Sequence, residues 1–277
     1  MGKIIEPSEA EPSRVERPEE EGAQPQPSAA ERVLDLRQMT DARVSLGRHG
    51  AGLPTGAQLS FLLDHARARE AVWTSVDRAA LEERLAVAGL DVVHVDSMAD
   101  DRSVYVRRPD LGRLLDPTST ERLKELAGGK GCDIAIVVAD GLSSSAVDLN
   151  AVPLIEALAP KLGELGLTVA SIVLASQARV ALGDPVGEAL GAKLTIVLVG
   201  ERPGLSAADS LGAYITYGPK PGNPDSGRNC VSNIRDGGLP ISEAASIIAA
   251  LVKDMVKTGV SGVALKAAVA KLGTSGV

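Results

Sequence analysis

The sequence is short of aromatic and metal-binding residues, and both shortages limit what the protein can do. Aromatic residues make up 2% of its 277 residues, and it has only three histidines and two cysteines. The cysteines, Cys132 and Cys230, lie far apart and form no C-x-x-C pair. A metal site is therefore not expected. Stacking on single-stranded nucleic acid also needs more aromatic side chains than this chain has.

Excess positive charge is missing as well. The formal net charge is −7 at pH 7, which argues against binding to nucleic acid or to a membrane surface, since polyanions need a basic face. No apolar run is long enough to span a bilayer, and the N-terminus has no apolar signal segment. We expect a soluble cytosolic protein with reduced thiols.

Glycine-rich nucleotide fingerprints are absent too. No G-x-G-x-x-G follows an apolar strand, and no G-x-x-x-x-G-K-[ST] occurs, so a nucleotide-binding Rossmann enzyme loses support. The stretch "ADGLSSSAVD" lacks the second glycine of a G-x-S-x-G nucleophile motif. No activated nucleophile or acid–base pair is visible, and no catalytic residue is predicted.

The chain begins with an acidic, proline-rich segment. Residues 1–31 contain five prolines, eight glutamates and no aromatic residue. Such a segment buries too little apolar surface to offset its chain entropy. We expect residues 1–32 to be a disordered tail, and a targeting or tethering peptide is the alternative.

Residues 33–127 have a mostly helical pattern. Thr55 is positioned to cap a helix over residues 56–73. A second helix is expected over residues 77–89, a short strand over 90–95, and another helix after residue 104. The first helix has an apolar stripe made of Leu59, Leu62, Leu63, Ala66 and Val72.

Residues 128–277 alternate apolar strands with helices. Strands are expected in "CDIAIVVADG", "LTVASIVLA", "LTIVLVG" and, as a fourth, "SLGAYITYG". Helices are expected in "LIEALAPKLGELG", kinked or split by Pro160, in "DPVGEALGAK", and after Ser242, which we expect to cap the last helix. The pattern predicts an α/β fold: a Rossmann-like parallel sheet with flanking helices. Its ligand should lie beyond the carboxyl ends of the strands.

Three strand ends carry polar residues. Ser143, Ser144 and Ser145 follow the first strand and suit either a phosphate or amide group of a ligand or simple helix capping. Gln177, Arg179 and Val180 follow the second strand, where they could clamp a ligand.

The third strand end holds Glu201 and Arg202 before a Pro-Gly turn. A surface ion pair contributes only about 0–1 kcal/mol, so it is a poor reason to hold both residues in a rigid turn. A ligand contact at this strand end is one interpretation, and a turn exposed to solvent is the alternative. Downstream, Cys230 lies among polar residues in "RNCVSNI", which we expect to be a loop. No histidine follows it to act as a base.

These motifs resemble a known family. "GAKLTIVLVGERPGLSAADSLGAYITY", "RNCVSNI", the final "GVALK" and the earlier "ARVSLGRHGAGLPTGAQLSFLLDHARAREAV" are similar to the small (light) chain of ethanolamine ammonia-lyase. The resemblance covers about residues 41–266, with several separated motifs in the same order.

The resemblance implies a subunit of an adenosylcobalamin-dependent carbon–nitrogen lyase. That enzyme converts ethanolamine to acetaldehyde and ammonia by a radical mechanism. Its small chain helps to bind cobalamin at the interface with a large chain, a TIM-type barrel, and is not active alone. The two chains form a higher hetero-oligomer in the bacterial cytoplasm, often associated with a microcompartment.

The resemblance also implies three cobalamin contacts: Val180, Glu201 and Cys230. The sequence lacks the D-x-H-x-x-G motif whose histidine replaces the lower base on cobalt, so we expect base-on cobalamin. A non-catalytic assembly or tethering protein and a nucleotide-binding Rossmann enzyme remain the alternatives.

Overall fold

The structure, a computed structural model, describes residues 42–274, and contacts group the described residues from Leu46 onward into one compact unit. The expected tail, residues 1–32, lies outside the described residues. The strands are β1 Val92–Asp96, β2 Cys132–Ala139, β3 Ile172–Ser176, β4 Ala192–Gly200, β5 Leu211–Tyr217 and β6 Arg228–Ile234. The helices are α1 Thr55–Trp73, α2 Arg78–Val87, α3 Arg102–Arg107, α4 Pro117–Ala127, α5 Ser144–Glu164, α6 Gly183–Leu190, α7 Ile241–Thr258 and α8 Val263–Thr274. Short 3-10 turns are η3 Leu111–Arg113, η4 Val180–Leu182 and η5 Asp225–Gly227.

The strands form one mixed sheet in the order β1-β3-β2-β4-β5-β6. The first four run parallel, while β5 is antiparallel to β4 and β6 is antiparallel to β5. The predicted α/β class is confirmed, but the sheet is not parallel throughout. The segment between β4 and β5 contains no helix to carry the chain back across the sheet, so β5 reverses direction.

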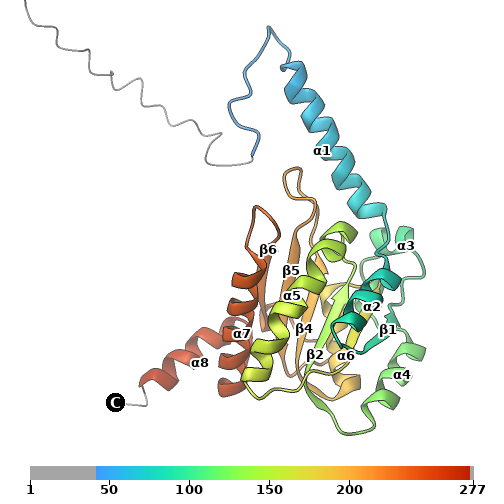
Figure 1. Cartoon of the computed structure of the whole chain (residues 1–277), viewed down its shortest axis with the longest axis vertical. Helices are drawn as coiled ribbons and strands as arrows, with labels where there is room; N and C mark the ends of the chain where they lie inside the picture. The colour runs from blue at the N-terminus through green and yellow to red at the C-terminus, as the bar shows by residue number, and fades with distance from the viewer. Residues whose placement is uncertain (1–41, 275–277) are drawn as a thin grey trace, which may run out of the picture. The chain divides into compact units, whose positions relative to one another are not determined.

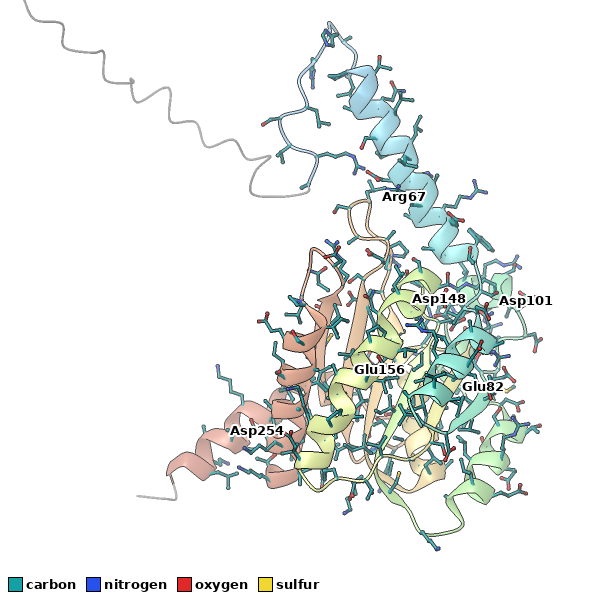
Figure 2. The ribbon with its side chains drawn as sticks, in the orientation of Figure 1. Arg67, Glu82, Asp101, Asp148, Glu156 and Asp254 are labelled. Atoms are coloured by element: carbon teal, nitrogen blue, oxygen red, sulfur yellow. The ribbon has the colours of Figure 1, made fainter. Side chains whose placement is uncertain are left out.

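Helices cover both faces of the sheet (Figure 1). Along β2, Ile134, Ile136 and Val138 belong to one core cluster, which also contains side chains of α2, α5 and α7. The intervening residues of β2 belong to a second cluster with Leu123 of α4 and Val186 of α6. This alternation follows from the two-residue repeat of a strand. Charged residues such as Glu82 of α2 and Glu156 of α5 are exposed on the outer sides of these helices (Figure 2).

The predicted helix ends are only partly correct. Thr55 and Ser242 do not cap their helices: Pro54 and Pro240 hold the N-cap positions, without side-chain caps. Pro160 does not split its helix, because α5 runs unbroken from Ser144 to Glu164. Burial of its apolar side chains against the sheet outweighs the hydrogen bond that a proline removes.

β1 joins the sheet by pairing with β3, although it comes from the region predicted to be mostly helical. The division of the chain at residues 127 and 128 stays a prediction. Within the described residues, no helix combines the length and the apolar character needed to cross a membrane.

Helix α1 differs from the others because most of it is exposed. Only Ala71 near its C-terminal end is buried, and the helix continues past the end of the sheet (Figure 1). Leu59, Leu62 and Leu63 of the predicted stripe are 61%, 52% and 51% exposed. Single exposed leucines are ordinary, but an exposed stripe indicates a contact surface.

Candidate functional site

The site is built from loops at the carboxyl ends of the parallel strands. Asp140 follows β2, residues 177–180 follow β3, and Glu201 follows β4. Gly141 and Gly200 let the first and third of these loops meet, since a Cβ on either residue would collide with backbone atoms of the other loop.

A buried ion pair fixes the loop after β3. Gln177 has a left-handed backbone, with φ of 49°, which is unusual for a residue other than glycine. The Asp140 carboxylate accepts hydrogen bonds from the backbone N–H groups of Gln177 and Ala178, at 3.0 and 2.8 Å. It also pairs with Arg102 at 3.1 Å. Burial raises the pKa of Asp140, while Arg102 and these backbone donors oppose that rise. The carboxylate thus holds the turn that presents Arg179 and Val180.

Two neighbouring hollows lie beside this turn, and both are lined by Arg179, Val180 and Tyr214. The larger hollow has a volume of about 680 Å³ and the smaller about 410 Å³. The larger is also lined by Pro109, Asp110, Arg113, Ala181, Asp225, Arg228 and Cys230. The smaller is also lined by Tyr105, Gly141, Leu142, Val199, Gly200, Glu201 and Arg202.

The structure therefore brings together the three residues that the sequence singled out. Val180 lines both hollows, Glu201 lines the smaller one, and Cys230 lines the larger one. One detail of the prediction is wrong: Cys230 lies on β6, paired opposite Tyr214 of β5, and not in a loop. The strand was missed because the free edge of the sheet leaves polar residues of β6 exposed.

The Glu201 carboxylate has hydrogen-bond partners within the chain. Among residues 42–274, Arg202 is not one of these partners. The Glu201 Oε2 atom accepts hydrogen bonds from the Ser210 hydroxyl at 2.5 Å and from the Asn233 backbone N–H at 3.2 Å. The carboxylate thus ties the turn after β4 to the start of β5 and to the end of β6. This contact explains a rigid turn better than a surface ion pair would.

Cys230 is exposed, and the pKa of its thiol is raised. Desolvation is the largest influence and raises its pKa, a hydrogen bond with Tyr214 lowers it, and the Glu201 carboxylate raises it further; the net shift is upward. A protonated thiol is a poor nucleophile. Cys230 is therefore suited to contact a ligand and not to attack one.

The serines after β2 are structural. The Ser143 hydroxyl accepts a hydrogen bond from the backbone N–H of Ala146 and donates one to the Ala208 carbonyl. This is an N-cap on α5. The Ser144 and Ser145 hydroxyls donate to the carbonyls of Ala71 and Ala208, so contacts within the chain account for all three serines.

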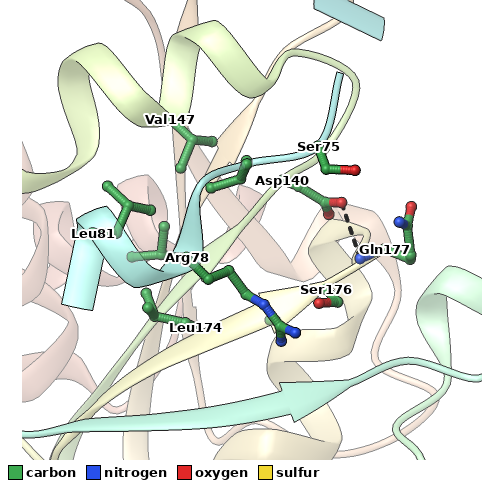
Figure 3. Close-up of a pocket in the computed structure, with 11 residues that line it drawn as sticks. Ser75, Arg78, Leu81, Asp140, Val147, Leu174, Ser176 and Gln177 are labelled. Carbon is green, nitrogen blue, oxygen red and sulfur yellow. Dashed lines mark hydrogen bonds between the residues drawn. The ribbon is translucent and has the colours of Figure 1, made fainter. Parts of the chain in front are cut away.

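A third hollow, of about 320 Å³, lies between α2 and the ends of β2 and β3 (Figure 3). Arg78 and Leu81 line it from α2, and Leu174, Ser176 and Gln177 line it from β3 and the following loop. Asp140 also borders it, but its carboxylate bonds to the Gln177 backbone, as Figure 3 shows. None of Val180, Glu201 and Cys230 lines this hollow.

Tyr214 is a lining residue that sequence reasoning missed. It lines both hollows from β5. The alternation of side chains in "LGAYITY" is a usable signal, since Ala213 and Ile215 are buried in the core cluster while Tyr214 faces the other way. The pairing of β5 with β4 places the face that carries Tyr214 beside Val180.

The chain matches a family model described as "Ethanolamine ammonia-lyase light chain (EutC)" over residues 30–266. Two relatives, from Rhodopseudomonas palustris (strain BisA53) and Bradyrhizobium diazoefficiens, are named "Ethanolamine ammonia-lyase small subunit". Each is 52% identical and covers 84% of this chain, with 89% and 90% of the relative's own length matched. A relative from Azotobacter vinelandii with the same name is 47% identical over 87% of this chain and 91% of its own. The family match spans most of the chain and each identity is high, so this chain belongs to the ethanolamine ammonia-lyase light chain family.

Proposed function

We propose that the chain is the small subunit of an adenosylcobalamin-dependent ethanolamine ammonia-lyase. It helps to bind base-on cobalamin at the interface with the large subunit, a TIM-type barrel. The complex deaminates ethanolamine to acetaldehyde and ammonia. The observation that carries the proposal is the pair of neighbouring hollows around Arg179, Val180 and Tyr214, with Glu201 and Cys230 at their walls.

The lining residues fit such a cofactor. Cobalamin is large and carries many neutral amides, so it needs a wide site with apolar contacts and hydrogen-bond acceptors. Val180 provides apolar contact, and Cys230 offers a neutral thiol. Glu201 uses its Oε2 atom within the chain, which leaves Oε1 to accept hydrogen bonds from ligand amides or hydroxyls.

When bound, the cofactor supplies the radical chemistry of the reaction. The residues of this chain bind and orient it. Neither hollow is lined by a histidine, and the two aspartates in the larger hollow, Asp110 and Asp225, pair with Arg108 and Arg113.

The exposed apolar stripe of α1 supports a protein partner. Leu59, Leu62 and Leu63 are spaced to lie on one helix face and are all more than half exposed. We assign this face to the large subunit because the relatives are named as small subunits. The complex is proposed to be a higher hetero-oligomer in the bacterial cytoplasm, where a microcompartment can enclose it.

A coupled acetaldehyde assay tests the proposal. This chain is co-expressed with a candidate large chain, and each chain is also produced alone. Activity with ethanolamine should require both chains and adenosylcobalamin. A well-folded, co-purifying complex without activity would overturn the proposed substrate or cofactor.

A further inference from the structure

Among the three residues that line both hollows, Arg179 is the charged one. It follows β3, precedes η4, and lines both hollows beside Val180. It is only partly buried, so its guanidinium group is accessible to a ligand in either hollow.

The surroundings hold this side chain in place. The guanidinium carbon lies 4.4 Å from the ring centre of Tyr105, a stacking arrangement typical of arginine. Tyr105 is buried, and its hydroxyl donates a hydrogen bond to the Ala178 carbonyl at 3.1 Å. The Arg179 backbone N–H donates to the Gly112 carbonyl at 2.8 Å. A Cβ on Gly112 would lie 2.8 Å from the Tyr105 ring, so only glycine permits this packing.

Arg179 also differs from its neighbours in charge balance. Four of the nearby arginines pair with carboxylates: Arg102 with Asp140, Arg228 with Asp184, Arg113 with Asp225, and Arg108 with Asp110. Arg202 has no such pair among residues 42–274, but it is exposed to solvent, which screens its charge. Within residues 42–274, Arg179 has no carboxylate partner, and its Nε atom is buried without a hydrogen-bond partner. Desolvating a guanidinium is costly unless an anion compensates it. The Arg179 guanidinium thus places an uncompensated positive charge at both hollows, where an anionic ligand group can bind.

We infer that Arg179 binds the phosphodiester of the cofactor's nucleotide tail; the inference rests on the proposed function. The side chains around the corrin ring are neutral amides, and the phosphodiester is the anion of the tail. A planar guanidinium binds phosphate oxygens with two parallel hydrogen bonds, which amides cannot match.

Three ligands isolate this contact in the two-chain complex. Adenosylcobalamin and adenosylcobinamide phosphate contain a phosphate, and adenosylcobinamide does not. Equilibrium dialysis gives the dissociation constant of each ligand for the wild-type complex and for Arg179→Gln. The substitution should weaken both phosphate-containing ligands by about 10- to 100-fold, the range expected for a charge-assisted contact. It should leave adenosylcobinamide within about twofold. Arg179→Lys keeps the charge but not the planar fork, so its loss should be intermediate.

Arg122→Gln is the matched control, because Arg122 is exposed and lines neither hollow. An equal loss for all three ligands in Arg179→Gln would show a structural role and overturn the inference. Unchanged binding of all three, or an equal phosphate-dependent loss in Arg122→Gln, would also overturn it. If the wild-type complex binds none of the three ligands, the proposed function itself fails.

Discussion

At the scale of single residues, Glu201 has two roles that can be separated. Its Oε2 atom holds Ser210 and Asn233, and its carboxylate borders the smaller hollow. Glu201→Ala should lower the free energy of unfolding by about 1–2 kcal/mol, because hydrogen bonds to a charged acceptor are lost. It should also weaken adenosylcobalamin binding several-fold in the two-chain complex. Denaturant unfolding and equilibrium dialysis measure the two effects.

Ser210→Ala provides the control for Glu201. It removes one donor to the carboxylate but keeps the carboxylate beside the hollow. Stability should fall, while cofactor affinity should stay within about twofold. Unchanged affinity in Glu201→Ala would remove Glu201 from the ligand site.

The sequence was informative about individual residues where they follow a strand directly. Glu201 could be assigned to a strand end because an apolar run ends directly before it. Val180 could be assigned to a strand end because it lies a few residues after another apolar run. The lack of a charge partner for Arg179 could not be predicted. It depends on Asp140 pairing with Arg102, which is 38 residues away in the sequence, and no local pattern encodes that choice.

At the scale of secondary-structure elements, α1 provides the sharpest test of assembly. Leu62→Asp places a charge in the exposed apolar stripe, where it would have to be desolvated against the large subunit. We expect co-purification with the large chain to be lost or strongly weakened. The thermal unfolding of the isolated chain should not change, because Leu62 is 52% exposed.

Ser60→Asp adds the same charge to α1 at an exposed position outside the stripe. It should leave co-purification intact. If Leu62→Asp co-purifies as well as the wild type, the stripe is not the contact with the large subunit.

The prediction of elements succeeded where hydrophobic patterning is strong and failed at their boundaries. β2 and β4 are mostly apolar because both faces are covered, and they were identified without difficulty. β6 was taken for a loop, since one of its edges is unpaired and its exposed residues are polar. The cap positions before α1 and α7 are prolines, so the nearby threonine and serine misled the assignment.

At the scale of the whole molecule, the sheet order explains where the hollows lie. After β2 the chain enters α5 on one face, and after β3 it enters α6 on the other face. The loops after these strands therefore diverge, and the third hollow lies at this divergence, bordered by Asp140 and Gln177. The loops after β3 and β4 and the antiparallel pair β5–β6 border the two hollows around Val180. The third hollow lies on the α2 and α5 side.

Hydrogen exchange of the two-chain complex, with and without adenosylcobalamin, tests the location of the cofactor site most directly. Bound cofactor should slow exchange in peptides that cover residues 177–182, 200–202 and 228–231. Residues 75–81, which border the third hollow, should exchange at an unchanged rate. Saturating cofactor that slows exchange only in residues 75–81, or in none of these segments, would contradict the assignment of the cofactor to Val180, Glu201 and Cys230.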